Sequence, residues 1–292
     1  MDNYTNAIEI NDLYKKYDGF TLDHISFNVP KGSIMGFIGQ NGAGKTTTIR
    51  LLMNIIKRDS GSIHMLGMDN IRDEFEIKKR TAVVFDELPF QDIFNAVQIE
   101  KVLCGMFDEW DHETYDNYLE RFGLPRKKKI GAFSKGMKMK LQIAAALSHN
   151  ADLLIMDEAT TGLDPVVRSE MLDIFLEYLQ NEEHSILMSS HITGDLEKAA
   201  DSVTFIDRGT LLLSGYKDDI LEDHGIIKCS KKDYGEIDPA DKISARITDF
   251  GAEVMVSCRK EMEQKYSGLV MDNTTLDEIM RFYVNRKVGE WN

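Results

Sequence analysis

The segment at residues 39–46 reads Gly39-Gln40-Asn41-Gly42-Ala43-Gly44-Lys45-Thr46 and fits the pattern G-x-x-x-x-G-K-S/T. Glycines let the backbone wrap closely around phosphate groups, and the N–H groups at the start of the following helix attract anions. Lys45 would neutralise the β- and γ-phosphates, and the Thr46 hydroxyl would bind Mg²⁺. The segment therefore predicts a site for a nucleoside triphosphate.

The flanking sequence supports this interpretation. Ile34 to Ile38 is an apolar run of strand length, and apolar residues recur at helical spacing from Thr46 to Ile56. A glycine turn without a ligand is the alternative, and the strand before it and the helix after it argue against that alternative. We expect the phosphate contacts to come from the following residues: Gly39, Gln40, Asn41, Gly42, Ala43, Gly44, Lys45, Thr46 and Thr47.

Two acidic residues follow a second apolar run. Leu153 to Met156 reads as a buried strand, and it ends in Asp157 and Glu158. Beside a phosphate loop, such a strand end holds magnesium and the attacking water. We expect Asp157 to hold Mg²⁺, commonly through water, and Glu158 to orient or deprotonate the attacking water. An acidic strand end that merely faces solvent is the alternative.

Further strand patterns alternate with helical ones. Buried strands are expected at residues 151–156, 185–189 and 203–206, and helical spacing at residues 95–122. This alternation favours an α/β fold with a mostly parallel sheet. After a weak boundary near residues 215–220, the pattern changes to short strands and a helix close to the C-terminal end.

The segment Phe133-Ser134-Lys135-Gly136-Met137 resembles the L-S-G-G-Q signature of ATP-binding cassette (ABC) ATPases. Ser134 and Gly136 match the signature, whereas the other three residues depart from it. Taken alone, the segment is also the start of a helix that Ser134 caps and that runs through Ala146.

Other motifs of the ABC family follow in the family's order. Thr161-Gly162-Leu163-Asp164 resembles the D-loop, and His191, after two serines, resembles the switch histidine that hydrogen-bonds the γ-phosphate. Tyr17 lies where the family stacks an aromatic ring on adenine. The resemblance covers about residues 8 to 215.

One position departs from the family, which has a glutamine after a strand near residue 85. Alignment on Pro89 places Glu87 there, and Asp86 and Gln91 are alternatives. A glutamate oxygen can ligate Mg²⁺, but it adds negative charge and cannot donate a hydrogen bond. Glu87 is thus expected both among the catalytic residues and among the metal ligands. The altered signature and this acidic loop most resemble the ABC-2-type exporters, which include bacitracin- and lantibiotic-resistance ATPases.

The resemblance implies a RecA-like P-loop cassette with an antiparallel β-subdomain and a helical subdomain at residues 1–219. Residues 220–292 would form a small α+β accessory region whose role stays open. In this family ATP binds between two cassettes arranged head to tail. One cassette supplies Lys45, Thr46, Asp157, Glu158 and His191, and the other supplies Ser134 and Gly136; Asp164 is also expected at the nucleotide.

Composition limits the partners. The chain has 292 residues, of which 42% are hydrophobic and 29% charged, and its formal net charge is −14. An acidic chain is a poor match for nucleic acid, so no nucleic-acid partner is expected. No uncharged apolar segment reaches the roughly 18 residues that span a bilayer, and no secretory signal is visible. Three dispersed cysteines favour a reducing cytosol over a disulfide framework.

These observations predict an ATPase subunit that uses ATP and Mg²⁺ to energise an ABC exporter at the cytoplasmic face of the membrane. Its partners would be a separate transmembrane permease subunit and a second cassette, either another copy or a paralogue. A soluble ABC ATPase that acts on ribosomes or nucleic acid is the main alternative. A P-loop kinase or GTPase is disfavoured by the signature, D-loop and switch histidine, and import is opposed only by the subfamily resemblance. The transported substrate is not readable from the chain.

Overall fold

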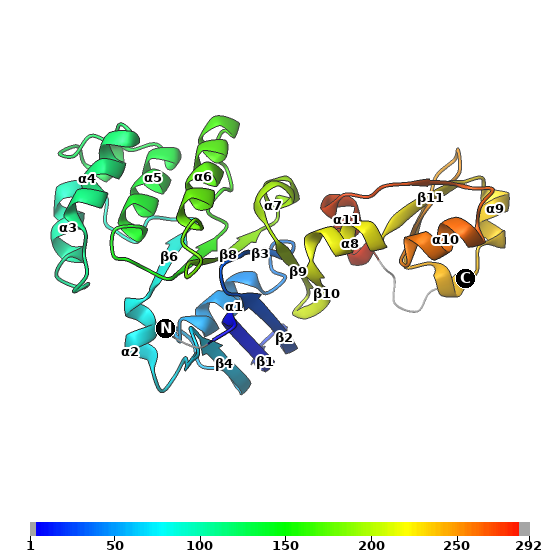
Figure 1. Cartoon of the computed structure of the whole chain (residues 1–292), viewed down its shortest axis with the longest axis horizontal. Coiled ribbons are helices and arrows are strands. Elements are labelled where there is room, and N and C mark those ends of the chain that lie inside the picture. Colours follow the sequence, from blue (N-terminus) through cyan, green and yellow to red (C-terminus); the bar gives the residue numbers. More distant parts are fainter. Residues whose placement is uncertain (1–3, 286–292) are drawn as a thin grey trace.

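The computed structural model describes residues 4–285, in which three sheets are covered by helices (Figure 1). The first sheet is antiparallel, with the order β2-β1-β4-β5. Its strands are β1 (Asn6–Tyr17), β2 (Phe20–Pro30), β4 (Ser60–Met65) and β5 (Met68–Asp69).

The second sheet is central and has the order β10-β9-β3-β8-β7-β6. All its neighbours pair in parallel except β9 and β10, which are antiparallel. Its strands are β3 (Ile34–Ile38), β6 (Thr81–Phe85), β7 (Leu153–Asp157), β8 (Ser185–Ser190), β9 (Ser202–Asp207) and β10 (Thr210–Tyr216). Every residue of β3 and β7 is buried, as expected for parallel strands that are covered on both faces.

Side-chain alternation along β7 separates two apolar cores. Leu153 and Ile155 pack with the antiparallel sheet and α1, whereas Leu154 and Met156 pack with the helical side. The helices of these layers are α1 (Lys45–Leu52), α2 (Glu74–Lys79), α3 (Ala96–Leu103), α4 (His112–Arg121), α5 (Lys135–Ala146), α6 (Pro165–Tyr178) and α7 (Thr193–Ala199). The predicted α/β cassette fold is therefore confirmed.

One predicted helical segment is shorter in the structure, and another is divided between two helices. The helix expected up to Ile56 ends at Leu52, because Asn54 adopts a left-handed conformation with φ of 51°, a common way to end a helix. The helical spacing expected at residues 95–122 corresponds to two helices, α3 and α4. Asn95 caps α3 and Asp111 caps α4, so local capping breaks the helical pattern into two pieces.

The C-terminal part projects away from the cassette (Figure 1). It consists of α8 (Lys217–Asp223), β11 (Gly225–Cys229), α9 (Lys231–Glu236), β12 (Ser244–Ile247), β13 (Ala252–Val256), α10 (Arg259–Lys265), β14 (Val270–Asp272) and α11 (Leu276–Val284). Its sheet is antiparallel, with the order β12-β13-β11-β14. None of the helices within residues 4–285 is long and apolar enough to span a bilayer.

The C-terminal part is attached through α11. The Leu276 N–H donates to the Glu197 carboxylate of α7 at 2.6 Å, and Leu276 and Ile279 join the large core of the cassette. A separate small core lies between the strands and α10. The division of the chain after residue 219 stays a prediction.

Candidate functional site

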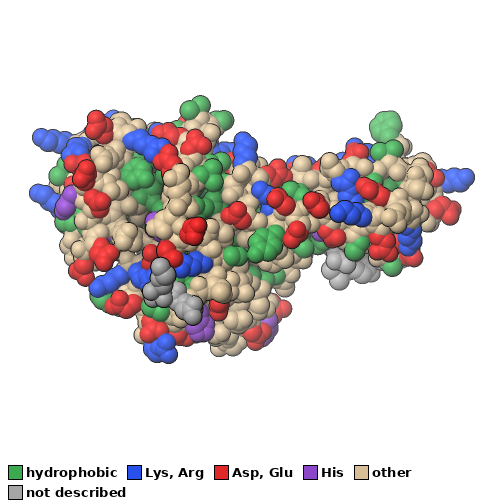
Figure 2. Space-filling view, in the orientation of Figure 1, with side chains coloured by type: hydrophobic (Ala, Val, Ile, Leu, Met, Phe, Trp, Pro, Cys, Tyr) green, Lys and Arg blue, Asp and Glu red, His purple; other side chains and the backbone are tan. Residues whose placement is uncertain are grey.

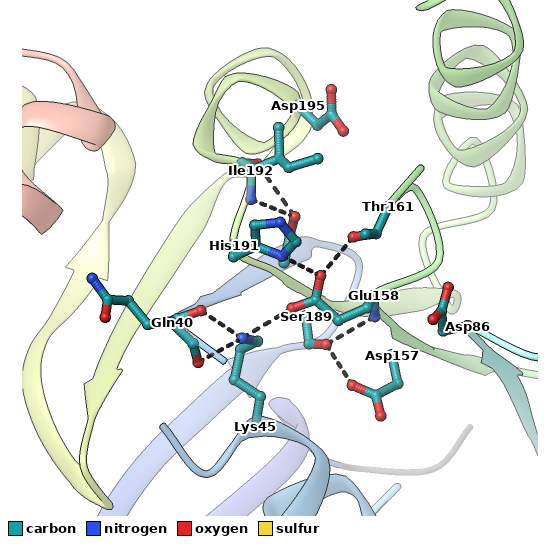
Figure 3. A network of polar contacts seen from close by, with 12 residues as sticks. Gln40, Lys45, Asp86, Asp157, Glu158, Thr161, Ser189, His191, Ile192 and Asp195 are labelled. Atoms are coloured by element: carbon teal, nitrogen blue, oxygen red, sulfur yellow. Dashed lines mark hydrogen bonds and ion pairs between the residues drawn. The ribbon is translucent and has the colours of Figure 1, made fainter. Parts of the chain in front are cut away.

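The candidate site lies where three strands of the central sheet end (Figure 3). β8 lies between β3 and β7, and Ser189 of β8 pairs with both Phe37 of β3 and Asp157 of β7. Because these strands are parallel, their carboxyl ends meet at one edge of the sheet. Ligands of open α/β sheets bind at this edge.

Lys45 lies at the centre of the site, with only 5% of its surface exposed. Its Nζ donates to the carbonyl oxygens of Gly39 at 2.5 Å and Gln40 at 3.2 Å. It also forms an ion pair with Glu158 Oε1 at 2.9 Å. This ion pair joins the phosphate loop directly to the acidic end of β7, a contact that the sequence analysis did not specify.

Glu158 receives further hydrogen bonds on its other oxygen. Thr161 Oγ1 donates to Glu158 Oε2 at 2.7 Å, and His191 Nδ1 lies 2.7 Å from the same oxygen. The backbone of Glu158 has φ of 54°, a left-handed conformation that is costly for a residue with a side chain. Strained backbone of this kind is typical of functional sites, and no pattern in the sequence indicated it.

These contacts set the charge state of Glu158. Burial alone would raise the pKa of its carboxyl, but hydrogen bonds from Thr161, Lys45 and His191, together with the Lys45 charge, outweigh burial and lower the pKa. Glu158 is therefore ionised at neutral pH. An ionised carboxylate can accept a proton from water, as a general base requires.

This lowered pKa predicts a pH-dependent contribution to stability. Because ionised Glu158 is favoured in the folded state, its contribution is present above the ordinary value of 4.5 and is lost as the pH falls through the lowered pKa. We expect the difference in free energy of unfolding between the wild type and Glu158→Gln to be constant near neutral pH and to shrink as the pH falls from the ordinary value of 4.5 through the lowered pKa. Denaturant unfolding of both proteins across this range would measure it. A difference that does not change with pH would contradict the assignment.

Asp157 is the second acidic residue at the site. Ser189 Oγ donates to Asp157 Oδ1 at 2.8 Å and accepts from the Glu158 N–H at 3.1 Å. Ser189 thereby orients both acids, a role that the sequence analysis missed. The signal available was a small polar residue at the end of a buried strand beside the candidate switch histidine.

The phosphate loop requires its glycines. A Cβ on Gly39 would lie 2.4 Å from the Ile206 carbonyl oxygen, and Gly44, with φ of 121°, would place a Cβ within 3.2 Å of Leu22 and Phe20. Asn41, Gly42 and Thr46 are exposed around this tight turn, so their polar groups are accessible to a phosphate group. The residues present therefore fit a bound triphosphate.

The Mg²⁺ expectation rests on fewer groups. Among the described residues no three His, Cys, Asp or Glu side chains come together as a complete metal site. Magnesium usually keeps several waters and binds one or two carboxylates plus substrate phosphates, so Thr46 and Asp157 fit that mode. Glu87 is exposed and makes no hydrogen bond or ion pair with another described residue, whereas Asp86 pairs with Lys135. The metal ligands stay predictions.

The remaining predicted residues lie on other elements. Ser134 caps α5 by accepting from the Met137 N–H at 3.2 Å, which confirms the predicted cap, and Gly136 follows in the first turn. Asp164 caps α6, and Tyr17 at the end of β1 is 41% exposed. Within residues 4–285 no hydrogen bond or ion pair joins Ser134 to the Lys45 network. Ser134 and Lys45 thus belong to different hydrogen-bond networks.

Comparison with known proteins identifies the family. The family model described as "ABC transporter" matches residues 22–161. The bacitracin transport ATP-binding protein BcrA of Bacillus licheniformis is 38% identical over 208 residues, covering 70% of this chain and 68% of that protein. The chain belongs to the ABC transporter family. It is an ATP-binding subunit of that family and an ATPase.

Alignments with other relatives cover a larger share of the relative's own length. The lantibiotic transport ATP-binding protein SrtF of Streptococcus pyogenes is 34% identical and aligns over 70% of this ABC subunit and 89% of SrtF. BcrA of Enterococcus faecalis is 29% identical over 98% of this chain and 87% of its own, so that similarity includes the C-terminal part.

A solved structure agrees with the fold. A chain described as the ATP-binding subunit of an ABC transporter has a TM-score of 0.65 and 25% identity, covering 74% of this chain and 92% of its own.

Proposed function

We propose that this ABC subunit hydrolyses ATP to drive an exporter whose membrane-spanning part is a separate polypeptide. The observation that carries this proposal is the Lys45–Glu158–His191 network, to which no hydrogen bond or ion pair among the described residues joins Ser134. The relatives named for bacitracin and lantibiotic transport support export. The working position would be the cytoplasmic face of the membrane.

We assign each residue of the site a task in hydrolysis. Glu158 accepts a proton from the attacking water, Lys45 binds the β- and γ-phosphates, and His191 binds the γ-phosphate. Thr46 and Asp157 would hold Mg²⁺, which neutralises phosphate charge when bound. Tyr17 would provide an exposed ring for adenine, and Asp164, which caps α6, would contact the nucleotide.

A second copy of the chain would complete the site. The N-terminus of α5, with Ser134 and Gly136, presents N–H groups suited to phosphate oxygens. Because no hydrogen bond or ion pair among the described residues joins Ser134 to the Lys45 network, the N-terminus of α5 is available to a nucleotide bound by another copy. Two copies arranged head to tail would then enclose two ATP molecules.

An apolar groove beside β6 is suited to bind the membrane partner. It has a volume of about 570 Å³ and is bordered by α2, β6, the loop after β6, α3 and α5. Phe75 and Met106 line it and are 70% and 66% exposed. Exposed apolar side chains at such a groove suit an amphipathic helix from another protein. On the face shown in Figure 2, apolar side chains also gather over α5 and α6.

We expect Phe75→Asp combined with Met106→Asp to separate the ATPase from its permease. A charge in an apolar groove would disfavour docking by desolvation, while both positions are exposed enough to leave the fold intact. The measurement is co-purification of the tagged full chain with a multi-span membrane protein from detergent-solubilised membranes, together with its basal ATP hydrolysis. Phe250→Asp is the control, because Phe250 is fully exposed in the C-terminal part.

Two results would count against this proposal. The wild-type chain would be found with ribosomes instead of membranes, or the double variant would retain its membrane partner at the wild-type level. The first result would favour the soluble ABC ATPase.

A further inference from the structure

Helix α5 starts with an unusual residue. Lys135 is the first residue after the Ser134 cap, and the first turn of this 12-residue helix contains no acidic side chain. A cation at a helix N-terminus is unfavourable, because the helix dipole places positive partial charge there. A residue that breaks a local rule in this way requires a compensating interaction.

Asp86 supplies that interaction. Lys135 Nζ lies 2.5 Å from Asp86 Oδ1, in the loop that follows β6. A second ion pair, Lys138 to Asp92 at 3.0 Å, joins the same helix to the same loop. The two pairs are similar in type, but only Lys135 belongs to the signature segment.

The Lys135–Asp86 pair lies beside the nucleotide site. Asp86 directly follows Phe85, which pairs with Asp157, so Asp86 lies at the catalytic edge of the sheet (Figure 3). On its other side, Lys135 lies against Gly162 of the segment that resembles the D-loop, since a Cβ on Gly162 would lie 3.4 Å from Nζ. Three segments that carry nucleotide motifs therefore meet at one lysine.

The ion pair is accessible to a competing anion. The Lys135 side chain is 43% exposed and that of Asp86 is 47% exposed. Exposed ion pairs contribute little to stability, because water screens both charges. A phosphate group carries more negative charge than a carboxylate and is a strong acceptor of charge-assisted hydrogen bonds.

We propose that Lys135 binds the γ-phosphate of ATP held by the second copy of the chain, and that Asp86 is its partner until that copy arrives. This inference rests on the proposed head-to-tail dimer. Lys135 exchanges Asp86 for the phosphate as the two cassettes close. Asp86 competes with the phosphate for Lys135 and so opposes closure at low ATP concentration.

The test uses two variants that break the same ion pair. The parent is the full chain with Glu158→Gln, in which slow hydrolysis preserves bound ATP. Sedimentation at increasing ATP concentration measures the concentration that gives half-maximal dimer. We expect Lys135→Gln to raise this concentration about tenfold, because a charge-assisted hydrogen bond to phosphate is lost. We expect Asp86→Asn to lower it, because the competing carboxylate is removed.

Opposite shifts separate this proposal from a structural role. If the ion pair only held the loop against α5, both variants would move the ATP requirement in the same direction. The matched controls are Lys138→Gln and Asp92→Asn, which break the neighbouring pair and are expected to change dimerisation less than twofold. Thermal unfolding of each variant without ATP checks that the fold is retained.

The two proposals fail in different ways. If the parent stays monomeric at saturating ATP, the head-to-tail dimer is wrong and the inference falls with it. If the parent dimerises but Lys135→Gln leaves the ATP concentration for half-maximal dimer unchanged, only the role of Lys135 is wrong. The same holds if Lys135→Gln and Asp86→Asn shift this concentration in the same direction.

Discussion

Glu158→Gln is expected to lower the rate of ATP hydrolysis about 10²- to 10³-fold, because the loss of a general base typically costs that much. The amide cannot accept the proton of the attacking water, yet it has nearly the same size as the carboxylate. Thr161 can still donate to its carbonyl oxygen, so the local structure should persist. ATP affinity should therefore stay within a few fold of the wild type.

The measurement is phosphate release under saturating ATP, together with equilibrium binding of a fluorescent ATP analogue. Glu182→Gln is a suitable control, because Glu182 is an exposed glutamate that does not belong to the Lys45–Glu158–His191 network. Hydrolysis by the Glu158 variant at nearly the wild-type rate would remove Glu158 from the role of base. A large loss of binding would instead indicate a role in holding the nucleotide.

Lys45→Ala should weaken ATP binding about 10²-fold, which corresponds to the loss of one or two hydrogen bonds to charged groups. Lys45 is buried within the phosphate loop, so no neighbouring cation can replace it without rearrangement of the loop. The substitution also removes the partner of Glu158 Oε1, and the pKa of Glu158 should rise towards its ordinary value. Binding and catalysis should both be affected.

Nucleotide titration and thermal unfolding would be measured on the same preparations. Lys57→Ala, at an exposed position shortly after α1, controls for the loss of one positive charge. An unchanged ATP affinity in a folded Lys45→Ala protein would refute the assignment of the phosphate loop.

The core strands were predictable because their signals are local. A strand such as β7, buried on both faces, must be a continuous apolar run. The phosphate loop and the Ser134 cap are also short patterns in which each residue has a backbone requirement. Helix ends were harder to predict. The end of α1 depends on the left-handed backbone conformation of Asn54, and most asparagines do not adopt that conformation.

The residues of the nucleotide site were predictable from the sequence, but the contacts between them were predictable only in part. Local motifs indicated Lys45, Asp157 and Glu158, and the resemblance to ABC ATPases added His191 and assigned all four residues to one nucleotide. Neither indicated that Ser189 would orient both acids, because that contact depends on the pairing of β7 with β8. The role of Glu87 and its alternatives stays a prediction, although Asp86 now has a defined partner.

Chain chemistry thus specified which residues can bind phosphate and activate water, since those capacities belong to side-chain types and to short backbone patterns. Tertiary structure decided which of them meet. Glu158 contacts Lys45 and His191, and Lys135 contacts Asp86, only because parallel strands and α5 bring together segments that are far apart in the chain. The lowered pKa of Glu158 arises from those contacts, so it is a property of the folded protein and not of the motif.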